Sequence, residues 1–204
     1  LAAMTLKIDA ANNIQWQKTF GGSDLDAAFS IRQAPNGGYF IFGHTQSSDN
    51  DVVGLHANSM DYWLIKIDSQ GNLLWHKCFG GDQIEEASSF EPTSDNGFVM
   101  VGSSNSNNGD VSGNHGFYDY WVVKTDSLLN IEWQRSLGGS QPDQAKDIKE
   151  TSDGGFIVVG YSLSANGDVT GNHGGGDIWV VKLNSLGTIE WQKAYGGTSG
   201  EIGY

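Results

Sequence analysis

Asp61-Tyr-Trp-Leu-Ile-Lys-Ile-Asp-Ser-Gln-Gly-Asn-Leu-Leu-Trp-His-Lys-Cys-Phe-Gly-Gly81 is the stretch that decides the fold. It contains two runs rich in β-branched and aromatic residues, 61–68 and 73–79, on either side of a Gln-Gly turn. This arrangement is typical of a β-hairpin. No window of comparable length shows the 3.6-residue apolar period of a helix. The stretch therefore predicts two antiparallel strands.

The register of this hairpin predicts what surrounds it. Centring the turn on Gln70-Gly71 places Lys66 opposite Trp75 and Leu64 opposite Lys77. One face is then expected to carry Tyr62, Leu64, Trp75 and Phe79, and the other Trp63, Ile65, Ile67, Leu74 and Cys78. Both faces are apolar, whereas a strand with one wet face alternates apolar and polar residues. We therefore expect a sheet that is covered on both sides.

The hairpin belongs to a repeat that runs through the chain. The tryptophans that mark its second strand are 59, 58 and 58 residues apart, at Trp16, Trp75, Trp133 and Trp191. A second column is Trp63, Trp121 and Trp179, and Gly-Gly pairs recur at 21–22, 80–81, 138–139 and 196–197. Runs at 87–91 and 98–102 supply a third and a fourth strand per unit. Repeats of this length indicate a propeller, with a solenoid as the second choice.

The predicted fold is all-β: a β-propeller of four-stranded antiparallel blades with about three and a half repeats of ~58 residues. We assign a partial blade to 1–25, blade repeats to 26–83, 84–141 and 142–199, and the start of another blade to 200–204. Closed propellers have roughly 4–8 blades. We therefore expect a fragment of a longer array, or a chain that closes with a partner copy.

The basic residues follow the repeat. Eight of the eleven fall into two columns, which are Lys7, Lys66, Lys124 and Lys182, and Lys18, Lys77, Arg135 and Lys193. Such regularity predicts structural roles, with the stems covering tryptophan and the charged heads pairing with aspartates. The lone cysteine, Cys78, occupies a column of small residues, so we expect no catalytic role for it.

Charge narrows the range of partners. The chain has 11 basic and 24 acidic residues, a formal net charge of −13. Such a field repels phosphate backbones and anionic lipid heads, so nucleic acid and direct membrane binding are disfavoured. No stretch approaches the ~20 apolar residues of a membrane helix.

One repeated loop is longer than folding requires. Its copies share an Asp, a Gly three residues later and a His five residues later. Candidate metal ligands are Asp51, Asp110 and Asp168, and candidate binding residues are Asn107, Asn114, His56, His115, Asn172 and His173. Calcium prefers such oxygen-rich loops, although their spacing is not that of an EF-hand. The alternatives are side chain-to-backbone turns, which we favour, and a zinc or proton-transfer site at the histidines.

The repeat also resembles a known family. Lys18-Thr-Phe-Gly-Gly-Ser-Asp-Leu-Asp-Ala-Ala-Phe-Ser-Ile31, with 36–45 and 151–162 after it, resembles the β-propeller repeats of secreted bacterial proteins. The Asn-Gly-Asp-Val-x-Gly-Asn-His-Gly loop is similar to that of Bacteroidetes surface proteins exported by type IX secretion. The resemblance covers the whole chain and implies export, an outer-surface location and contact with the secretion machinery. It implies no reaction.

We therefore expect a non-catalytic, extracellular propeller module that acts as an adhesion or binding scaffold for glycan or protein. One alternative is part of a propeller hydrolase or quinoprotein with its site in other blades, since 66–75 also resembles a quinoprotein segment. Another is a structural spacer or secretion cargo. No nucleophile elbow, phosphate loop or paired metal motif is present in the sequence.

Overall fold

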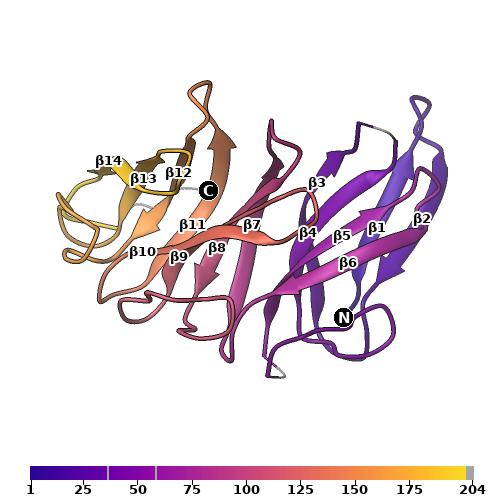
Figure 1. Cartoon of the computed structure of the whole chain (residues 1–204), viewed down its shortest axis with the longest axis horizontal. Coiled ribbons are helices and arrows are strands. Elements are labelled where there is room, and N and C mark those ends of the chain that lie inside the picture. The colour runs from indigo at the N-terminus through magenta and orange to yellow at the C-terminus, as the bar shows by residue number, and fades with distance from the viewer. Residues whose placement is uncertain (36, 58, 201–204) are drawn as a thin grey trace.

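The computed structural model describes residues 1–35, 37–57 and 59–200 of the chain and shows fourteen β-strands and no helix within them (Figure 1). A two-stranded sheet contains β1 (Ala3–Ile8) and β2 (Ile14–Phe20). The first four-stranded sheet contains β3 (Asp26–Gln33), β4 (Tyr39–Thr45), β5 (Asp61–Ile67) and β6 (Leu73–Phe79). The second contains β7 (Glu85–Pro92), β8 (Phe98–Ser104), β9 (Asp119–Thr125) and β10 (Ile131–Leu137). The third contains β11 (Asp143–Glu150), β12 (Phe156–Ser162), β13 (Asp177–Leu183) and β14 (Ile189–Tyr195).

Each sheet is an antiparallel meander in which consecutive strands pair. The prediction of an all-β chain built from four-stranded antiparallel sheets is confirmed. By repeat position, β1 and β2 correspond to the third and fourth strands of the other sheets. Residues 201–204, part of the segment assigned to a further blade, lie outside the described residues. The structure contains no helix of the length and apolar character needed to span a membrane, within the described ranges.

The turn between β5 and β6 is held by Asp68 and Gly71. The Asp68 carboxylate accepts hydrogen bonds from the backbone N–H groups of Gln70 and Asn72, each at 2.8 Å. Gly71 has a φ of 81°, in the left-handed region that glycine enters without a Cβ penalty. This side chain-to-backbone turn fixes the register of β5 and β6.

The predicted register is confirmed at two of its pairs and corrected at one residue. Lys66 pairs with Trp75 and Leu64 with Lys77, as the turn predicts. A β-bulge between Lys66 and Ile67 then pairs Ile67 with Leu73 instead of its neighbour. Leu74 is consequently not on the buried face with Trp63, as we expected, and is 57 % exposed. The bulge inserts one residue and so reverses the side to which the strand end points.

Apolar clusters fill the gaps between successive sheets, as the apolar faces of the hairpin predict. The Tyr62 ring of the first sheet packs 4.6 Å from Trp121 of the second and donates its hydroxyl to the Trp121 carbonyl at 3.0 Å. Tyr120 makes the same bond to Trp179 of the third sheet, at 3.2 Å. At the opposite end of the sheets, Trp133 donates its indole N–H to the Ser185 carbonyl at 3.1 Å. The tyrosine bond therefore recurs between the first and second and between the second and third four-stranded sheets.

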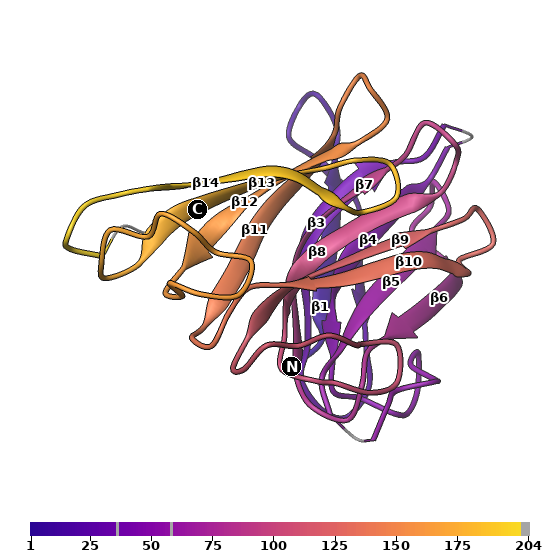
Figure 2. The same cartoon turned by 60° about the vertical axis from the view of Figure 1, so that its left-hand side comes forward.

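The sheets fan out from their first strands. Strands β3, β7 and β11 contact one another in succession, whereas the fourth strands β6, β10 and β14 make no comparable contacts with one another in the described chain. In Figure 2, β6 and β14 lie on opposite sides of the view, with β3, β7 and β11 between them. Side chains on the first strands of all three sheets can therefore converge, while the outer strands bound separate gaps.

Candidate functional site

The predicted aspartates of the repeated loop bind the backbone of the preceding sheet. The loop joins the second and third strands of each four-stranded sheet. The Asp110 carboxylate accepts a hydrogen bond from the Gly80 N–H at 3.2 Å, and the Asp168 carboxylate does the same with Gly138 at 3.2 Å. Asp51 accepts from the Gly21 N–H at 3.3 Å. These carboxylates clamp the Gly-Gly pair that ends the previous repeat unit.

The predicted asparagines mostly stabilise the loop itself. Asn107 accepts a hydrogen bond from the Gly113 N–H at 2.9 Å. Asn114 donates its side-chain amide to the carbonyls of Ser104 and Phe117, and Asn172 donates to the Ser162 carbonyl at 3.2 Å. These bonds replace the ladder partners that an irregular backbone lacks, which is how Asn residues act in turns.

Each predicted histidine pairs with a buried aspartate at the start of the next strand. The Nδ1–carboxylate distances are 2.6 Å for His56 and Asp61, and 2.7 Å both for His115 with Asp119 and for His173 with Asp177. All three aspartates are fully buried. Burial raises the pKa of Asp119 to about 6, partly opposed by the hydrogen bonds from the His115 backbone and side chain. Sequence reasoning noted the histidines and did not find these partners.

Two of the histidines also face an aspartate of the following sheet. His56 Nε2 lies 3.9 Å from the Asp110 carboxylate, and His115 Nε2 lies 3.9 Å from that of Asp168. The structure thus brings candidate residues of neighbouring repeats together in pairs. It does not gather Asp51, Asp110 and Asp168, which belong to three different sheets. Within the described ranges no three His, Cys, Asp or Glu residues are grouped to hold a metal ion. The calcium assignment stays a prediction, which thermal unfolding with and without a chelator tests.

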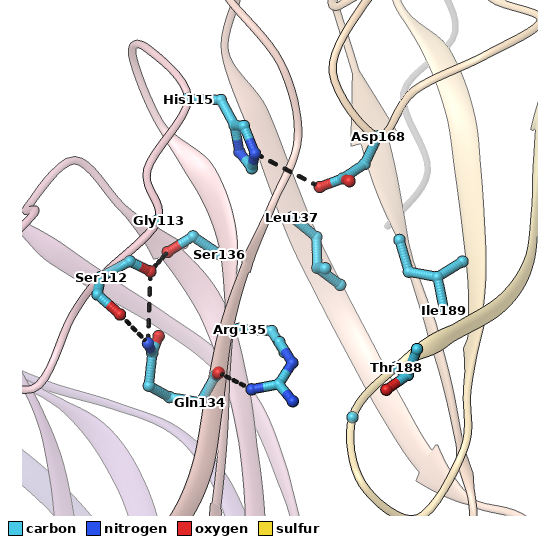
Figure 3. A pocket seen from close by; sticks show the side chains of 11 residues that line it. Ser112, Gly113, His115, Gln134, Arg135, Ser136, Leu137, Asp168, Thr188 and Ile189 are labelled. Carbon is cyan, nitrogen blue, oxygen red and sulfur yellow. Dashed lines mark hydrogen bonds and ion pairs between the residues drawn. The ribbon is translucent and has the colours of Figure 1, made fainter.

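One of these histidine–aspartate pairs borders a pocket of about 490 Å³ between the second and third sheets, which we call the inter-sheet pocket. Figure 3 shows His115 and Asp168 facing each other at one end, with Gln134 and Arg135 away from them. The polar lining residues are Ser112, His115, Gln134, Arg135, Ser136, Asp168 and Thr188.

Side-chain size accounts for the pocket. Leu137 lines it, whereas the same position in the first sheet is Phe79, which is fully buried against the second sheet. Ser136 likewise occupies the position of Cys78. Leucine is smaller than phenylalanine, so Leu137 fills less of the gap beside its sheet than Phe79 does.

The pocket wall is held by hydrogen bonds. Gln134 donates to the Ser112 hydroxyl at 2.5 Å and accepts from the Trp121 indole at 3.0 Å. Arg135 donates to the Leu186 carbonyl at 2.8 Å and lies over the Trp133 ring, with 5.8 Å from the guanidinium carbon to the ring centre. The repeat predicts a structural role for Arg135, and the structure places it at the pocket as well. Glutamine occupies the same repeat position at Gln17 and Gln192, so Gln134 gave no sequence signal for the pocket.

Comparisons with known proteins leave the chain without a family. No protein-family model and no curated protein matches it. Among solved structures, it is similar to a protein of unknown function from Bacteroides caccae, with 12% sequence identity over 96% of this chain and 76% of that chain. The TM-score of that match is 0.34, so it supports no conclusion about fold or function.

Proposed function

We propose that the chain is a non-catalytic, extracellular β-propeller module that binds glycan or protein through the inter-sheet pocket. The three four-stranded antiparallel sheets fan out about their first strands, which is the arrangement of successive propeller blades. Loops and pockets between such blades are rigidly supported by the sheets on both sides, which favours selective binding.

The observation that carries the proposal is the meeting of His115 and Asp168 at the pocket. They belong to loops of different repeats, and their side chains lie 3.9 Å apart at one end of the pocket that Arg135 also lines. The pocket thus offers hydrogen-bond donors of a guanidinium and an imidazole together with a carboxylate acceptor. A ligand with both donors and acceptors, such as a glycan or a peptide backbone, can satisfy them.

The geometry favours binding over catalysis. A histidine acting as a general base for a nucleophile needs one ring nitrogen within hydrogen-bond reach of a hydroxyl or thiol. In His115 one ring nitrogen binds the Asp119 carboxylate and the other faces Asp168. The same pair recurs at His56 and Asp61, as expected for a structural element of the repeat.

Export to the outer surface by a secretion machinery is part of the same proposal. Its support is the likeness of the repeat to secreted bacterial propeller proteins, together with the acidic surface charge. Cell fractionation of the native host, with an antibody against the chain, tests it. Recovery in the cytoplasm alone contradicts the location.

The binding proposal is tested by a glycan array and by peptide-ligand selection with the chain and two variants. Arg135→Gln removes a charge from the pocket, and Lys77→Gln removes its counterpart in the first sheet, which donates to the Leu129 carbonyl in the same way. We expect ligand binding to be lost in the first variant and kept in the second. An absence of ligands for the chain, or equal losses in both variants, contradicts the proposal.

A further inference from the structure

The first strand of every four-stranded sheet contains a β-bulge at the same place. The pairing with the second strand shifts between Ala28 and Ser30, between Ala87 and Ser89, and between Ala145 and Asp147. The extra residue has no partner in the ladder, and it is Phe29, Ser88 or Lys146. The side chain of a bulge residue does not follow the regular alternation between the two faces of the sheet. Bulges are frequent beside functional sites.

The three bulge residues lie at one pocket although the repeat does not conserve them. This pocket, of about 550 Å³, is lined by the bulge residues and by Glu86, Gln144 and His44, and we call it the first-strand pocket. Glu86 and Gln144 precede their bulges by two residues and occupy the same repeat position, with Ala27 as the third member. The repeated backbone thus presents side chains that differ in every unit. The first-strand pocket and the inter-sheet pocket share no lining residue.

We propose that the first-strand pocket binds a neutral saccharide, with Phe29 as the surface on which a sugar ring stacks. The Phe29 side chain is 54 % exposed, although it is large and apolar. A sugar has an apolar face of C–H groups and a rim of hydroxyls, which fits an aromatic ring surrounded by polar groups. This site is separate from the one proposed above and does not depend on it.

The charges in the pocket narrow the class of ligand. Glu86 and Lys146 come from neighbouring first strands and line the same space, and no ion pair joins them among the described residues. The Glu86 carboxylate and the net charge of −13 disfavour an anion. The Lys146 ammonium disfavours a cation. Hydroxyl groups donate to carboxylate and accept from ammonium, so a neutral polyhydroxylated ligand satisfies both.

His44 supplies independent support for a ligand. It is 9 % exposed, it lines the pocket, and its Nδ1 has no hydrogen-bond partner among the described residues. Burial lowers the pKa of His44 to about 4, so the ring is neutral at physiological pH and can donate or accept. Its ring packs edge-on against Phe29, with centroids 4.9 Å apart. A sugar stacked on Phe29 would therefore lie close to a buried polar atom that lacks a partner.

Saturation-transfer NMR followed by calorimetric titration tests the proposal. The probes are glucose, galactose, N-acetylglucosamine, cellobiose and lactose, added singly to the whole chain. We expect saturable binding of at least one of them. Phe29→Ala should weaken that binding about tenfold, and Lys146→Met and Glu86→Gln should each weaken it several-fold. Because Phe29 is exposed, its removal leaves folding intact, which circular dichroism verifies.

Lys77→Gln is the matched control, since Lys77 lines neither pocket and its change should leave sugar binding unchanged. A loss with Arg135→Gln and none with Phe29→Ala would overturn this inference and support the inter-sheet pocket instead. The inference is also overturned if none of the five sugars binds, or if Phe29→Ala binds as the unchanged chain does. Saturable binding that Phe29→Ala alone abolishes supports it even if the inter-sheet pocket proves to bind nothing.

Discussion

The ammonium group of Lys66 lies 3.8 Å from the centre of the Phe40 ring. Its equivalents Lys124 and Lys182 are each bound by two carboxylates, from the preceding turn and from the fourth strand. In the first sheet those two positions are Asn36, which lies outside the described residues, and Leu74, and neither is acidic. The Lys66 Nζ is buried without a hydrogen-bond partner in the described chain. Its cation–π contact with Phe40 therefore takes the place of the two ion pairs that Lys124 and Lys182 make.

Leu74→Glu should therefore stabilise the protein. The new carboxylate would occupy the position of Glu132, which binds Lys124 at 2.8 Å. Leu74 is mostly exposed, so its removal takes little from the core. We expect the free energy of unfolding to rise by about 1 kcal/mol in urea titrations. Leu128→Glu, a change of the same kind on an exposed turn, should have no such effect. A loss of stability in Leu74→Glu would contradict the equivalence of the two positions.

Glu85 should make stability depend on pH. Burial raises its pKa from 4.5 to about 7, which the bonds from Ser106, Gly81 and Ser104 partly oppose and Asp61 reinforces. The folded state therefore binds the Glu85 proton more tightly than the unfolded state. Its contribution to stability is full below pH 4.5 and is lost as the pH rises through about 7.

Glu85→Gln removes that titration. The stability of the variant relative to the unchanged chain should rise by roughly 3 kcal/mol between pH 4 and pH 8, measured by urea unfolding at each pH. Glu86→Gln is the neighbouring control, because that side chain is only partly buried. Parallel pH profiles for the unchanged chain and Glu85→Gln would show that Glu85 does not titrate in this range.

The contact between His115 and Asp168 should couple two sheets energetically. We expect His115→Ala to destabilise the fold by about 2 kcal/mol, since it deprives the buried Asp119 of a charge-assisted hydrogen bond. A double-mutant cycle with Asp168→Asn should give an interaction energy of about 0.5 kcal/mol or more. The control cycle joins His173→Ala with Asp168→Asn, because His173 binds Asp177 and not Asp168. Equal interaction energies in the two cycles would refute the coupling.

Gly138 should not tolerate a side chain. A Cβ there would lie 2.5 Å from the Asp143 carboxylate and 2.6 Å from that of Asp119, both of them buried. Gly138→Ala should therefore cost several kcal/mol, more than ~3 by analogy with overpacked cores. Gly113→Ala separates this clash from backbone strain. Its φ is 84° and nothing lies near the added Cβ, so its cost should be only about 1 kcal/mol. Similar melting temperatures for the two variants would argue against the clash.

The strands and their pairing into sheets could be predicted from the sequence, because the residues that determine them are close in sequence or recur at a fixed period. Tryptophan spacing and turn residues predicted the hairpin register of Lys66 with Trp75, which the structure confirms. The assumption that side chains alternate regularly between the two faces of the sheet was wrong at Leu74. A bulge adds a residue there, and no residue type in the sequence indicates it. Bulges depend on how neighbouring strands twist and pack, and this information is not contained in a single strand.

The functional candidates were harder to predict for a related reason. The loop at His115 stood out because it repeats, and the structure shows that much of this repetition serves hydrogen bonds to Asp119 and to Gly-Gly pairs. Phe29, Ser88 and Lys146 drew no attention because they do not resemble one another. Only the packing of the first strands, which is set by long-range contacts, reveals that they share a pocket.

The bulges of the first strands have an evolutionary consequence. When a repeat unit is duplicated, its copy inherits the backbone that presents the bulge residue, and the identity of that residue remains free to diverge. The same backbone position is accordingly occupied by three unrelated side chains, Phe29, Ser88 and Lys146. An array of this kind can acquire a new binding preference by drift at single codons, without any change to the columns on which its folding depends.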